Sequence, residues 1–344
     1  GQSGINRNPH PLADGKLLMQ WYPWLNASYK HIISQHQAGR AHHALLVQSL
    51  PGMGDSALVW GVSRWLMCTQ PTGMKSCGEC HGCQLMAAYN HPDWYSLTAE
   101  KGKSSIGVDA IRQVTDKLYH FAQQGGAKVI HIPVAEQLTE AAANALLKTL
   151  EEPPANCWFF LSTHQPSALP ATLRSRCMTL HLSVPAEQQS LHWLTGQTTQ
   201  QESDTLTALR LAGGAPAAAL EMLTGSQWQQ RNKLCQMLIE SLPDNTLGLL
   251  PLLSQDDVAL RIHWLMALLL DAVKYHQQNL RWMTNIDQQP LVAKLAALMP
   301  VAVLHHSLSL WMQCRHHILE TPSVNHELLV TEALLDWEQS FHAG

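Results

Sequence analysis

Short apolar runs alternate with amphipathic stretches through the first half of the chain, and this alternation restricts the possible folds more than any other feature of the sequence. The apolar runs have the length and composition of buried strands and lie at residues 44–48, 94–98, 127–132 and 157–162. The amphipathic stretches between them predict helices at residues 56–68, 108–121 and 140–152. Strands that alternate with helices form βαβ units, so the sequence predicts an α/β domain with a parallel sheet whose faces are covered.

The second half of the chain is predicted to be helical, because the strand pattern disappears after about residue 183. Short helices are expected near residues 191–194, 206–211 and 217–223. Longer amphipathic helices follow from about residue 227, with breaks at Pro243, residues 277–279, Pro300 and Pro322. The fold class is therefore α/β plus all-α, and a length of 344 residues agrees with two or three domains. We expect the α/β domain over residues 19–182, a small helical domain over 183–226 and a helical bundle over 227–344.

Residues 1–18 do not fit this pattern. They are polar, contain Gly, Asn and Pro, and lack the charged and apolar regions of a signal peptide. We expect them to be an added tag that precedes a native start at Met19. The longest apolar run elsewhere, residues 265–273, is far shorter than the ~20 residues of a membrane-spanning helix and contains Asp271. A cytoplasmic protein with no membrane segment is therefore expected.

Four cysteines form a C-x8-C-x2-C-x2-C arrangement, namely Cys68, Cys77, Cys80 and Cys83. Four thiolates that leave no coordination position open are typical of a structural Zn²⁺ site rather than a catalytic one, so one zinc ion is predicted here. An iron–sulfur cluster is the alternative that four cysteines leave open. The remaining cysteines lie in apolar segments and are expected in the core, namely Cys157, Cys177, Cys235 and Cys314.

The segment after the first predicted strand has the context of a phosphate-binding loop, which is a strand, a glycine-rich turn and a helix. Aligned with the pattern G-x-x-x-x-G-K-[ST], the loop contains Ser49, Gly52, Gly54, Asp55 and Ser56. Asp55 takes the position of the lysine that faces the β- and γ-phosphates, so an attraction becomes a repulsion of several kcal/mol. The alternative is that this segment was never more than a tight turn.

The predicted strand at residues 127–132 shows a second loss. An ATPase needs an acidic pair at the end of this strand to hold Mg²⁺, but Pro133 and Val134 follow it here and neither can bind a cation. Two independent losses predict that the loop neither binds nor hydrolyses ATP.

The charge of the chain argues against one class of function. Its formal net charge is −4 and only 14% of its residues are charged. A protein that binds DNA on its own usually has a basic footprint. Only Lys75 is basic between Cys68 and Cys83. A nucleic-acid-binding protein built on the cysteine segment is therefore a disfavoured alternative.

Two further motifs are NALLKTLEEPP at Asn144–Pro154 and LRSRC at Leu173–Cys177. Together with the cysteine segment and the altered loop, they make the chain resemble the delta-prime family of subunits of the bacterial DNA polymerase III clamp loader, from Met19 to about residue 335. The resemblance implies an AAA+ α/β domain with a zinc module, a small helical lid domain and a C-terminal helical collar domain. It also implies a function in DNA replication.

The resemblance implies a non-catalytic stator subunit that helps the ATP-dependent loading of the sliding clamp onto primed DNA. Its partners would be the ATPase subunits tau and gamma and the delta subunit, with the clamp and the DNA contacted through the assembled complex. Arg176, flanked by Ser175 and Cys177, would be an arginine finger that reaches ATP bound by the neighbouring subunit. A guanidinium suits this role because it is always charged and can bind two phosphate oxygens. Without the resemblance, Arg176 would be interpreted as a helix-end or ion-pairing residue.

The sequence also departs from the active members of this superfamily. They place an arginine on the lid helix to sense the nucleotide, whereas Ala217 lies near that position here. Thr163 lies where a polar sensor would be, but without a nucleotide it has nothing to sense. The helix at 140–152 is expected to direct Lys148 and Glu151 or Glu152 towards an interface, while its leucines pack inward. An ATP-hydrolysing motor subunit is the alternative, and the aspartate in the loop disfavours it.

Overall fold

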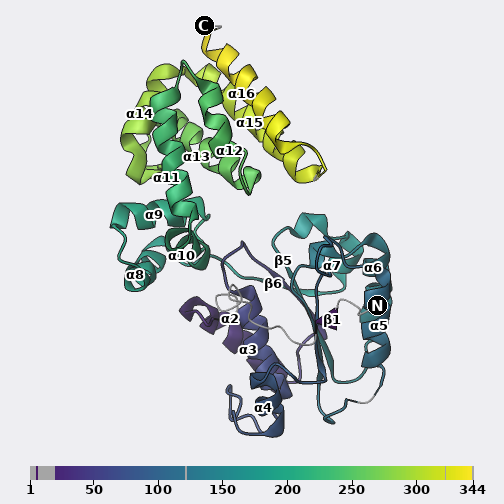
Figure 1. The fold of residues 1–344 in the computed structure, drawn as a ribbon. Helices are drawn as coiled ribbons and strands as arrows, with labels where there is room; N and C mark the ends of the chain where they lie inside the picture. Colours follow the sequence, from purple (N-terminus) through teal and green to yellow (C-terminus); the bar gives the residue numbers. More distant parts are fainter. Residues whose placement is uncertain (1–4, 7–19, 121, 322, 343–344) are drawn as a thin grey trace. The chain divides into compact units, whose positions relative to one another are not determined.

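The computed structural model describes residues 5–6, 20–120, 122–321 and 323–342. The chain divides into two compact units, residues 1–184 and residues 185–344. The first unit contains a sheet and helices, and the second contains helices (Figure 1), so the predicted α/β plus all-α fold is confirmed. The predicted tag at residues 1–18 lies outside the described residues except for Ile5 and Asn6.

A six-stranded sheet with the order β1-β3-β4-β5-β2-β6 forms the centre of the first unit. Its strands are β1 (Ile5–Asn6), β2 (Ala44–Gln48), β3 (Trp94–Leu97), β4 (Lys128–Ile132), β5 (Cys157–Thr163) and β6 (Met178–His181). All neighbouring pairs are parallel except β1 with β3. The register aligns Val47 of β2 with Ser162 of β5, and Ile132 of β4 with Leu161. The carboxyl ends of β2, β4 and β5 therefore meet at one edge of the sheet.

Helices cover both faces of this sheet (Figure 1). On one face, α2 (Asn26–Gln37) packs against α3 (Asp55–Met67), which contacts β4 and β5. On the other face, α5 (Val108–Leu118) packs against α6 (Glu140–Glu151), and α7 (Ala171–Ser175) packs against α6. The short helix α4 (His81–Ala87) contacts α3.

The predicted strands and helices of the first unit are confirmed, with small changes at their ends. The Thr139 side chain caps α6 by accepting a hydrogen bond from the Ala142 N–H at 3.1 Å, and the helix ends just before Pro153. The sequence did not predict α2, α4, α7, β1 or β6. Three of the four residues of β6 are exposed at the edge of the sheet, so this strand lacks the apolar run of a buried strand.

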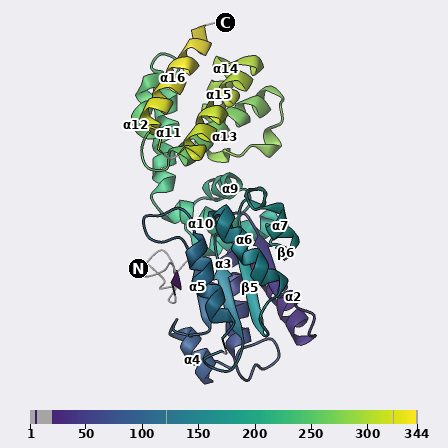
Figure 2. The same ribbon diagram turned by 90° about the vertical axis from the view of Figure 1, so that its right-hand side faces the viewer.

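The second unit is built from helices α8 (Glu187–Gln197), α9 (Glu202–Leu211), α10 (Pro216–Thr224), α11 (Gln227–Ser241), α12 (Leu250–Leu253), α13 (Val258–His276), α14 (Gln289–Leu298), α15 (Val301–Glu320) and α16 (His326–His342). Helices α13 and α15 lie side by side (Figure 2). The predicted breaks at Pro243, residues 277–279 and Pro300 fall between helices, and Pro322 lies outside the described residues.

Within the described residues, no single helix has the length and apolar character of a membrane span. One pair, residues 286–298 and 301–320, meets that test only when the two helices are taken together, and they are bent by 109°.

A buried ionic network joins three helices of the second unit. Arg231 on α11 is fully buried and donates to both carboxylate oxygens of Asp287, at 2.6 and 2.8 Å, and to Oδ1 of Asn285 at 2.7 Å. Asp271 on α13 accepts from the backbone and the side chain of Asn285, both at 2.7 Å. The Asp287 N–H donates to Oγ1 of Thr207 on α9 at 3.3 Å. The network therefore connects α9, α11 and α13 through one loop.

We expect Arg231→Ala to lower the free energy of unfolding of the second unit by about 3–5 kcal/mol, because Asp287 would be left buried without its counter-charge. Urea denaturation followed by circular dichroism measures this loss. Lys233→Ala, at an exposed position of the same helix, should change the free energy by no more than about 0.5 kcal/mol. A similar small change in Arg231→Ala would contradict the stabilising role of the network.

Candidate functional site

The loop between β2 and α3 has the shape of a phosphate-binding turn. Gly52 and Gly54 both have a φ angle of 83°, a left-handed conformation that glycine adopts without strain. Gly54 is the N-cap residue of α3, so the first N–H groups of the helix lie next to the turn. The Ser49 N–H donates to the Thr163 carbonyl at 3.2 Å and joins the loop to the end of β5. Anions bind in proteins at such a helix N-terminus after a glycine-rich turn.

Aromatic side chains from the segment before α2 cover this loop. The Trp24 indole N–H donates to the Met53 carbonyl at 2.8 Å. The Tyr22 ring, which is 1% exposed, stacks on Trp24 with ring centroids 4.6 Å apart. A Cβ atom at Gly54 would lie only 2.7 Å from Cδ2 of Tyr22, so this ring lies directly against the loop backbone. The chain's own residues therefore close one side of the loop.

Asp55 is the first residue of α3, and its carboxylate lies where the helix dipole favours a negative charge. Its Oδ2 atom lies 3.6 Å from Nε2 of His164, which follows β5. The contact with the Asp55 carboxylate raises the pKa of His164 above its usual value, against the effect of burial. Burial lowers the pKa of His131 on β4 to about 4, despite the nearby Asp55 charge, so this second histidine is neutral. At the position predicted for a phosphate-binding lysine, the structure thus has a carboxylate that pairs with a histidine.

A carboxylate does occur beyond β4, two residues after Val134. It belongs to Glu136 in the short turn η2 (Ala135–Gln137). Its Oε2 atom accepts from Oγ1 of Thr163 at 2.8 Å and from the N–H groups of His164 and Gln165 at 3.1 and 3.2 Å. These bonds hold η2 against the end of β5. Thr163, predicted to lie at the position of a polar sensor, therefore has a partner within the protein.

Arg176 is the C-cap residue of α7, and its side chain is 53% exposed. Its Nη2 atom lies 3.1 Å from Oε1 of Glu151 at the end of α6. The two motifs that led to the family resemblance are therefore in contact. The Arg176 N–H donates to the Leu173 carbonyl at 3.1 Å, so the turn at the end of α7 sets the position of the arginine backbone.

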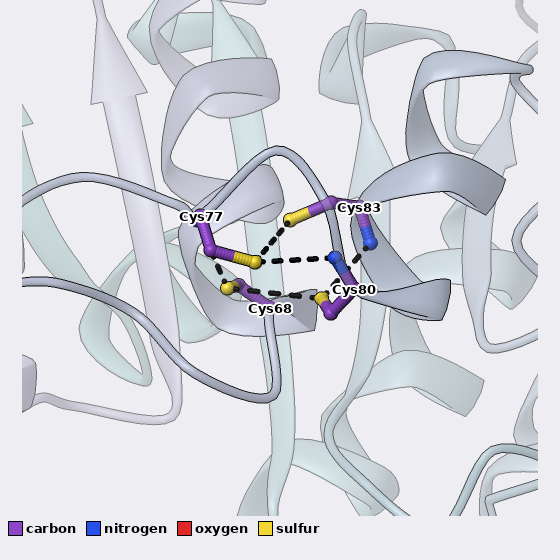
Figure 3. A group of neighbouring side chains, drawn as sticks. All are labelled: Cys68, Cys77, Cys80 and Cys83. Carbon is purple, nitrogen blue, oxygen red and sulfur yellow. Dashed lines mark hydrogen bonds between the residues drawn. The ribbon is translucent and has the colours of Figure 1, made fainter.

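The side chains of Cys68, Cys77, Cys80 and Cys83 converge (Figure 3). Their sulfur atoms lie within 4.8 Å of one another, and the Cys77–Cys83 and Cys68–Cys80 pairs are each 3.9 Å apart. Four thiolates that surround one ion tetrahedrally at ~2.3 Å have sulfurs ~3.8 Å apart. The structure therefore brings together the four predicted cysteines, here called the cysteine cluster, at a spacing that could hold one metal ion.

The backbone around the cysteine cluster directs several N–H groups towards the sulfur atoms. N–H groups of the segment donate to cysteine sulfurs at 3.2 to 3.4 Å. Gly82 approaches the end of α3 so closely that a Cβ atom there would lie 2.2 Å from the Met67 carbonyl oxygen. Burial opposes ionisation of Cys80, but hydrogen bonds from Thr69 and the Cys83 N–H outweigh it and lower the pKa of Cys80 to about 5. N–H groups also lower the pKa of Cys77, whereas burial raises the pKa of Cys68 and raises that of Cys83 to about 12. The thiolate, which is the form that binds a metal, is therefore favoured at Cys77 and Cys80.

Family models match nearly all of the described chain. "DNA polymerase III, delta subunit" matches residues 24–186, "DNA polymerase III subunit delta', AAA+ ATPase lid domain" matches residues 185–224, and "DNA polymerase III, delta subunit, C terminal" matches residues 225–339. DNA polymerase III subunit delta' of Yersinia pestis is 52% identical over 332 residues, which cover 95% of this chain and 98% of that protein. The chain belongs to the delta-prime family of DNA polymerase III subunits.

Other relatives agree with this family. The delta-prime subunit of Escherichia coli strain K12 is 48% identical over 95% of this chain and 98% of its own length. A tau/gamma subunit of DNA polymerase III from Haemophilus influenzae is 32% identical over 54% of this chain and 28% of its own length. The resemblance to the delta-prime family and the AAA+ architecture with lid and C-terminal helical domains are confirmed, while the domain boundaries stay predictions.

The structure locates the sequence-predicted residues of this delta-prime chain and adds others. The five predicted loop residues lie in or beside the turn between β2 and α3, and Ala217 lies on α10 of the second unit. Sequence reasoning missed His164, Glu136 and Tyr22. A signal for His164 was present, because a residue that follows a strand of a parallel sheet lies beside the loop that follows the neighbouring strand.

We expect the Asp55–His164 pair to make stability depend on pH. A histidine whose pKa rises on folding contributes stability below its unfolded pKa of about 6.5 and loses this contribution as the pH rises through its folded-state pKa. Asp55→Asn should therefore reduce the free energy of unfolding more at pH 6 than at pH 9, by up to about 1 kcal/mol for a partly exposed pair. Thermal unfolding of both proteins at the two pH values measures the difference.

The comparison isolates the pair, because the other titrating groups that face His164, such as Glu136, are present in both proteins. His164→Gln should show the same loss of pH dependence, and the double variant should show no further loss. An equal effect of Asp55→Asn at pH 6 and pH 9 would refute the pairing.

Proposed function

We propose that the chain is a non-catalytic subunit of a DNA polymerase III clamp loader that completes the ATP site of a neighbouring ATPase subunit. The observation that carries this proposal is the Asp55–His164 pair, because its carboxylate lies at the amino end of α3, where a bound phosphate would lie. The subunit would help the ATP-dependent loading of the sliding clamp onto primed DNA in the cytoplasm. It would belong to a polymerase holoenzyme without being an enzyme by itself.

Both charge and space oppose nucleotide binding in the loop. A triphosphate at the amino end of α3 would lie next to the Asp55 carboxylate, and the like charges would repel each other. The Tyr22 ring against Gly54 and the Trp24 ring beside it would also resist displacement, because their apolar surface would become exposed. The chain on this proposal binds no ATP and acts as a stator.

Arg176 is suited to a neighbour's ATP because it is exposed and weakly held. Its ion pair with Glu151 is about half exposed on both sides, at 53% and 49%. Surface pairs of this kind contribute only about 0–1 kcal/mol, so phosphate oxygens can replace Glu151 at small cost. The planar guanidinium can then donate two parallel hydrogen bonds to a phosphate.

The partners of this face would be ATPase subunits of the tau/gamma type, with the delta subunit elsewhere in the complex. Lys148 and Glu152 of α6 are exposed beside Glu151, whereas Leu146 and Leu150 of the same helix are buried. The helix therefore has a polar face next to Arg176, which would contact the ATPase neighbour. The buried leucines of α6 pack in the core of the first unit and take no part in this contact.

We also propose that the cysteine cluster holds one Zn²⁺ ion in a structural role. Four thiolates at tetrahedral spacing leave no open position for a substrate. Sulfurs within 4.8 Å of one another leave room for one ion but not for a cluster of several iron and sulfide atoms. When bound, zinc would tie the end of α3 to the start of α4 and stabilise this segment locally.

We expect Arg176→Ala to lower the ATPase and clamp-loading rates of the reconstituted complex without dissociating it. Arginines supplied in trans raise the catalytic rate of GTPases by about 10³–10⁵-fold, which is the upper limit of the effect expected here. The ATP sites that this chain does not complete should continue to turn over, and they set the rate that remains. Steady-state ATPase and clamp-loading assays measure the effect, and gel filtration verifies the assembly.

Glu151→Gln is the matched control, because it breaks the same ion pair but keeps the arginine. If Arg176 acts on a neighbour's ATP, Glu151→Gln should leave the rates unchanged or slightly higher. If both variants lower the rates equally, Arg176 acts only through its ion pair within the chain and the finger is refuted.

We expect Cys77→Ser to lower the zinc content from one ion per chain to well below one, because a serine hydroxyl keeps its proton and binds zinc poorly. Atomic absorption after dialysis against a chelator measures the content. Cys314→Ser, in the second unit and outside the cluster, should retain one zinc. Iron in the unmodified protein, or full zinc content in Cys77→Ser, would contradict the assignment.

A further inference from the structure

A pocket of about 480 Å³ lies between α2, α3 and the loop of the cysteine segment. Its charged lining residues are Lys30 from α2, Arg64 from α3 and Lys75 from the loop, and no acidic residue lines it. This concentration of positive charge stands out in a chain with a net charge of −4. We call this site, completed by Trp21 and Tyr29, the basic pocket.

The three cations of the basic pocket are available to a ligand. All three side chains are exposed. Within the described part of the chain, none of them forms a salt bridge with a carboxylate. Cations held together without counter-charges attract an anion from solution.

Neutral hydrogen bonds hold the walls of the pocket in place. The Tyr29 hydroxyl on α2 donates to the Met74 carbonyl of the loop at 2.6 Å. The Gly73 carbonyl accepts from the side chains of Gln37 and Trp65, at 2.9 and 3.0 Å. The loop is therefore fixed to both helices without using any of the three cations.

Trp21 provides an aromatic surface at the same pocket. Its side chain is 38% exposed, and its indole N–H donates to Oδ1 of Asn26 at 2.8 Å. Its ring meets the Tyr29 ring edge-on at 5.4 Å. A Cβ atom at Gly61 would lie 2.9 Å from Cζ3 of Trp21, so the absence of a side chain on α3 makes room for this ring. The ring is thus held in one position while part of it faces solvent.

We propose that the basic pocket binds a short stretch of single-stranded DNA, with phosphates near Lys30, Arg64 and Lys75 and a base against Trp21. Cations that follow a backbone, combined with an exposed aromatic ring, are the two elements of sequence-independent single-strand binding. An acidic peptide without apolar or aromatic side chains would satisfy the cations but would leave the aromatic ring unused. The site is local, which agrees with a chain that lacks a basic footprint overall.

The test is fluorescence anisotropy of a labelled oligo(dT) of fifteen nucleotides, titrated with the full chain at several salt concentrations. We expect a dissociation constant in the range of about 10⁻⁶–10⁻⁴ M. Three phosphate contacts predict a slope of log K against log salt of about −2, and Lys30→Ala, Arg64→Ala or Lys75→Ala should each reduce it to about −1.4. Trp21→Ala should weaken binding by about 5- to 150-fold, the factor for stacking of one base, whereas Trp21→Phe should retain most of the affinity.

Lys101→Ala and Lys233→Ala are the matched controls, because each removes one exposed positive charge outside the pocket. They should leave the affinity and the slope unchanged, and circular dichroism verifies that all variants are folded. Equal losses in these controls would overturn the proposal, since binding would then follow total charge. Competition by poly-glutamate as strong as that by unlabelled oligo(dT), with no effect of Trp21→Ala, would also overturn it in favour of an acidic protein partner.

This inference stands apart from the proposed function. Arg176→Ala should leave oligo(dT) binding by the isolated chain unchanged, whereas Lys75→Ala should leave the arginine finger intact. Each proposal can therefore be refuted by its own experiment, whatever the outcome for the other proposal.

Discussion

The negative charge of Asp55 at the amino end of α3 determines the electrostatics of the loop between β2 and α3. A helix that begins after a glycine-rich turn attracts an anion, and in this chain the anion is part of the helix itself. Asp55 raises the pKa of His164, and Glu136 accepts hydrogen bonds from the Thr163 hydroxyl and from the N–H groups of His164 and Gln165. The chain's own charged side chains thus hold together the carboxyl edge of the sheet.

The loop between β2 and α3 is held by several internal contacts, whereas the Arg176 side chain has one exposed ion pair. Movement of the loop would break the bond between Trp24 and the Met53 carbonyl and would uncover Tyr22, which is almost fully buried. Arg176, by contrast, extends from a short helix and has one half-exposed partner. On the proposed function, internal contacts replace the nucleotide-responsive parts of the ATPase fold, and the arginine that would serve a neighbour lies at the surface.

Local patterns explain what could be predicted from the sequence. The strands of the parallel sheet are continuous apolar runs, Thr139 is a capping residue before a helical run, and the spacing of the four cysteines implies one tetrahedral site. The edge strand β6 was missed because most of its residues are exposed. The Asp55–His164 pair was missed because it depends on the register between β2 and β5, which no local pattern contains.

The basic pocket is another feature that the sequence alone did not predict. Between Cys68 and Cys83, the sequence contains Lys75 as its single basic residue, and that count argues against nucleic-acid binding. The fold adds Lys30 from α2 and Arg64 from α3, because neutral hydrogen bonds to Gly73 and Met74 carry the cysteine loop onto these helices. A metal at the cysteine cluster would hold the loop at its other end. The cysteine cluster and the basic pocket are therefore both formed by one folded segment, which places Lys75 beside Lys30 and Arg64.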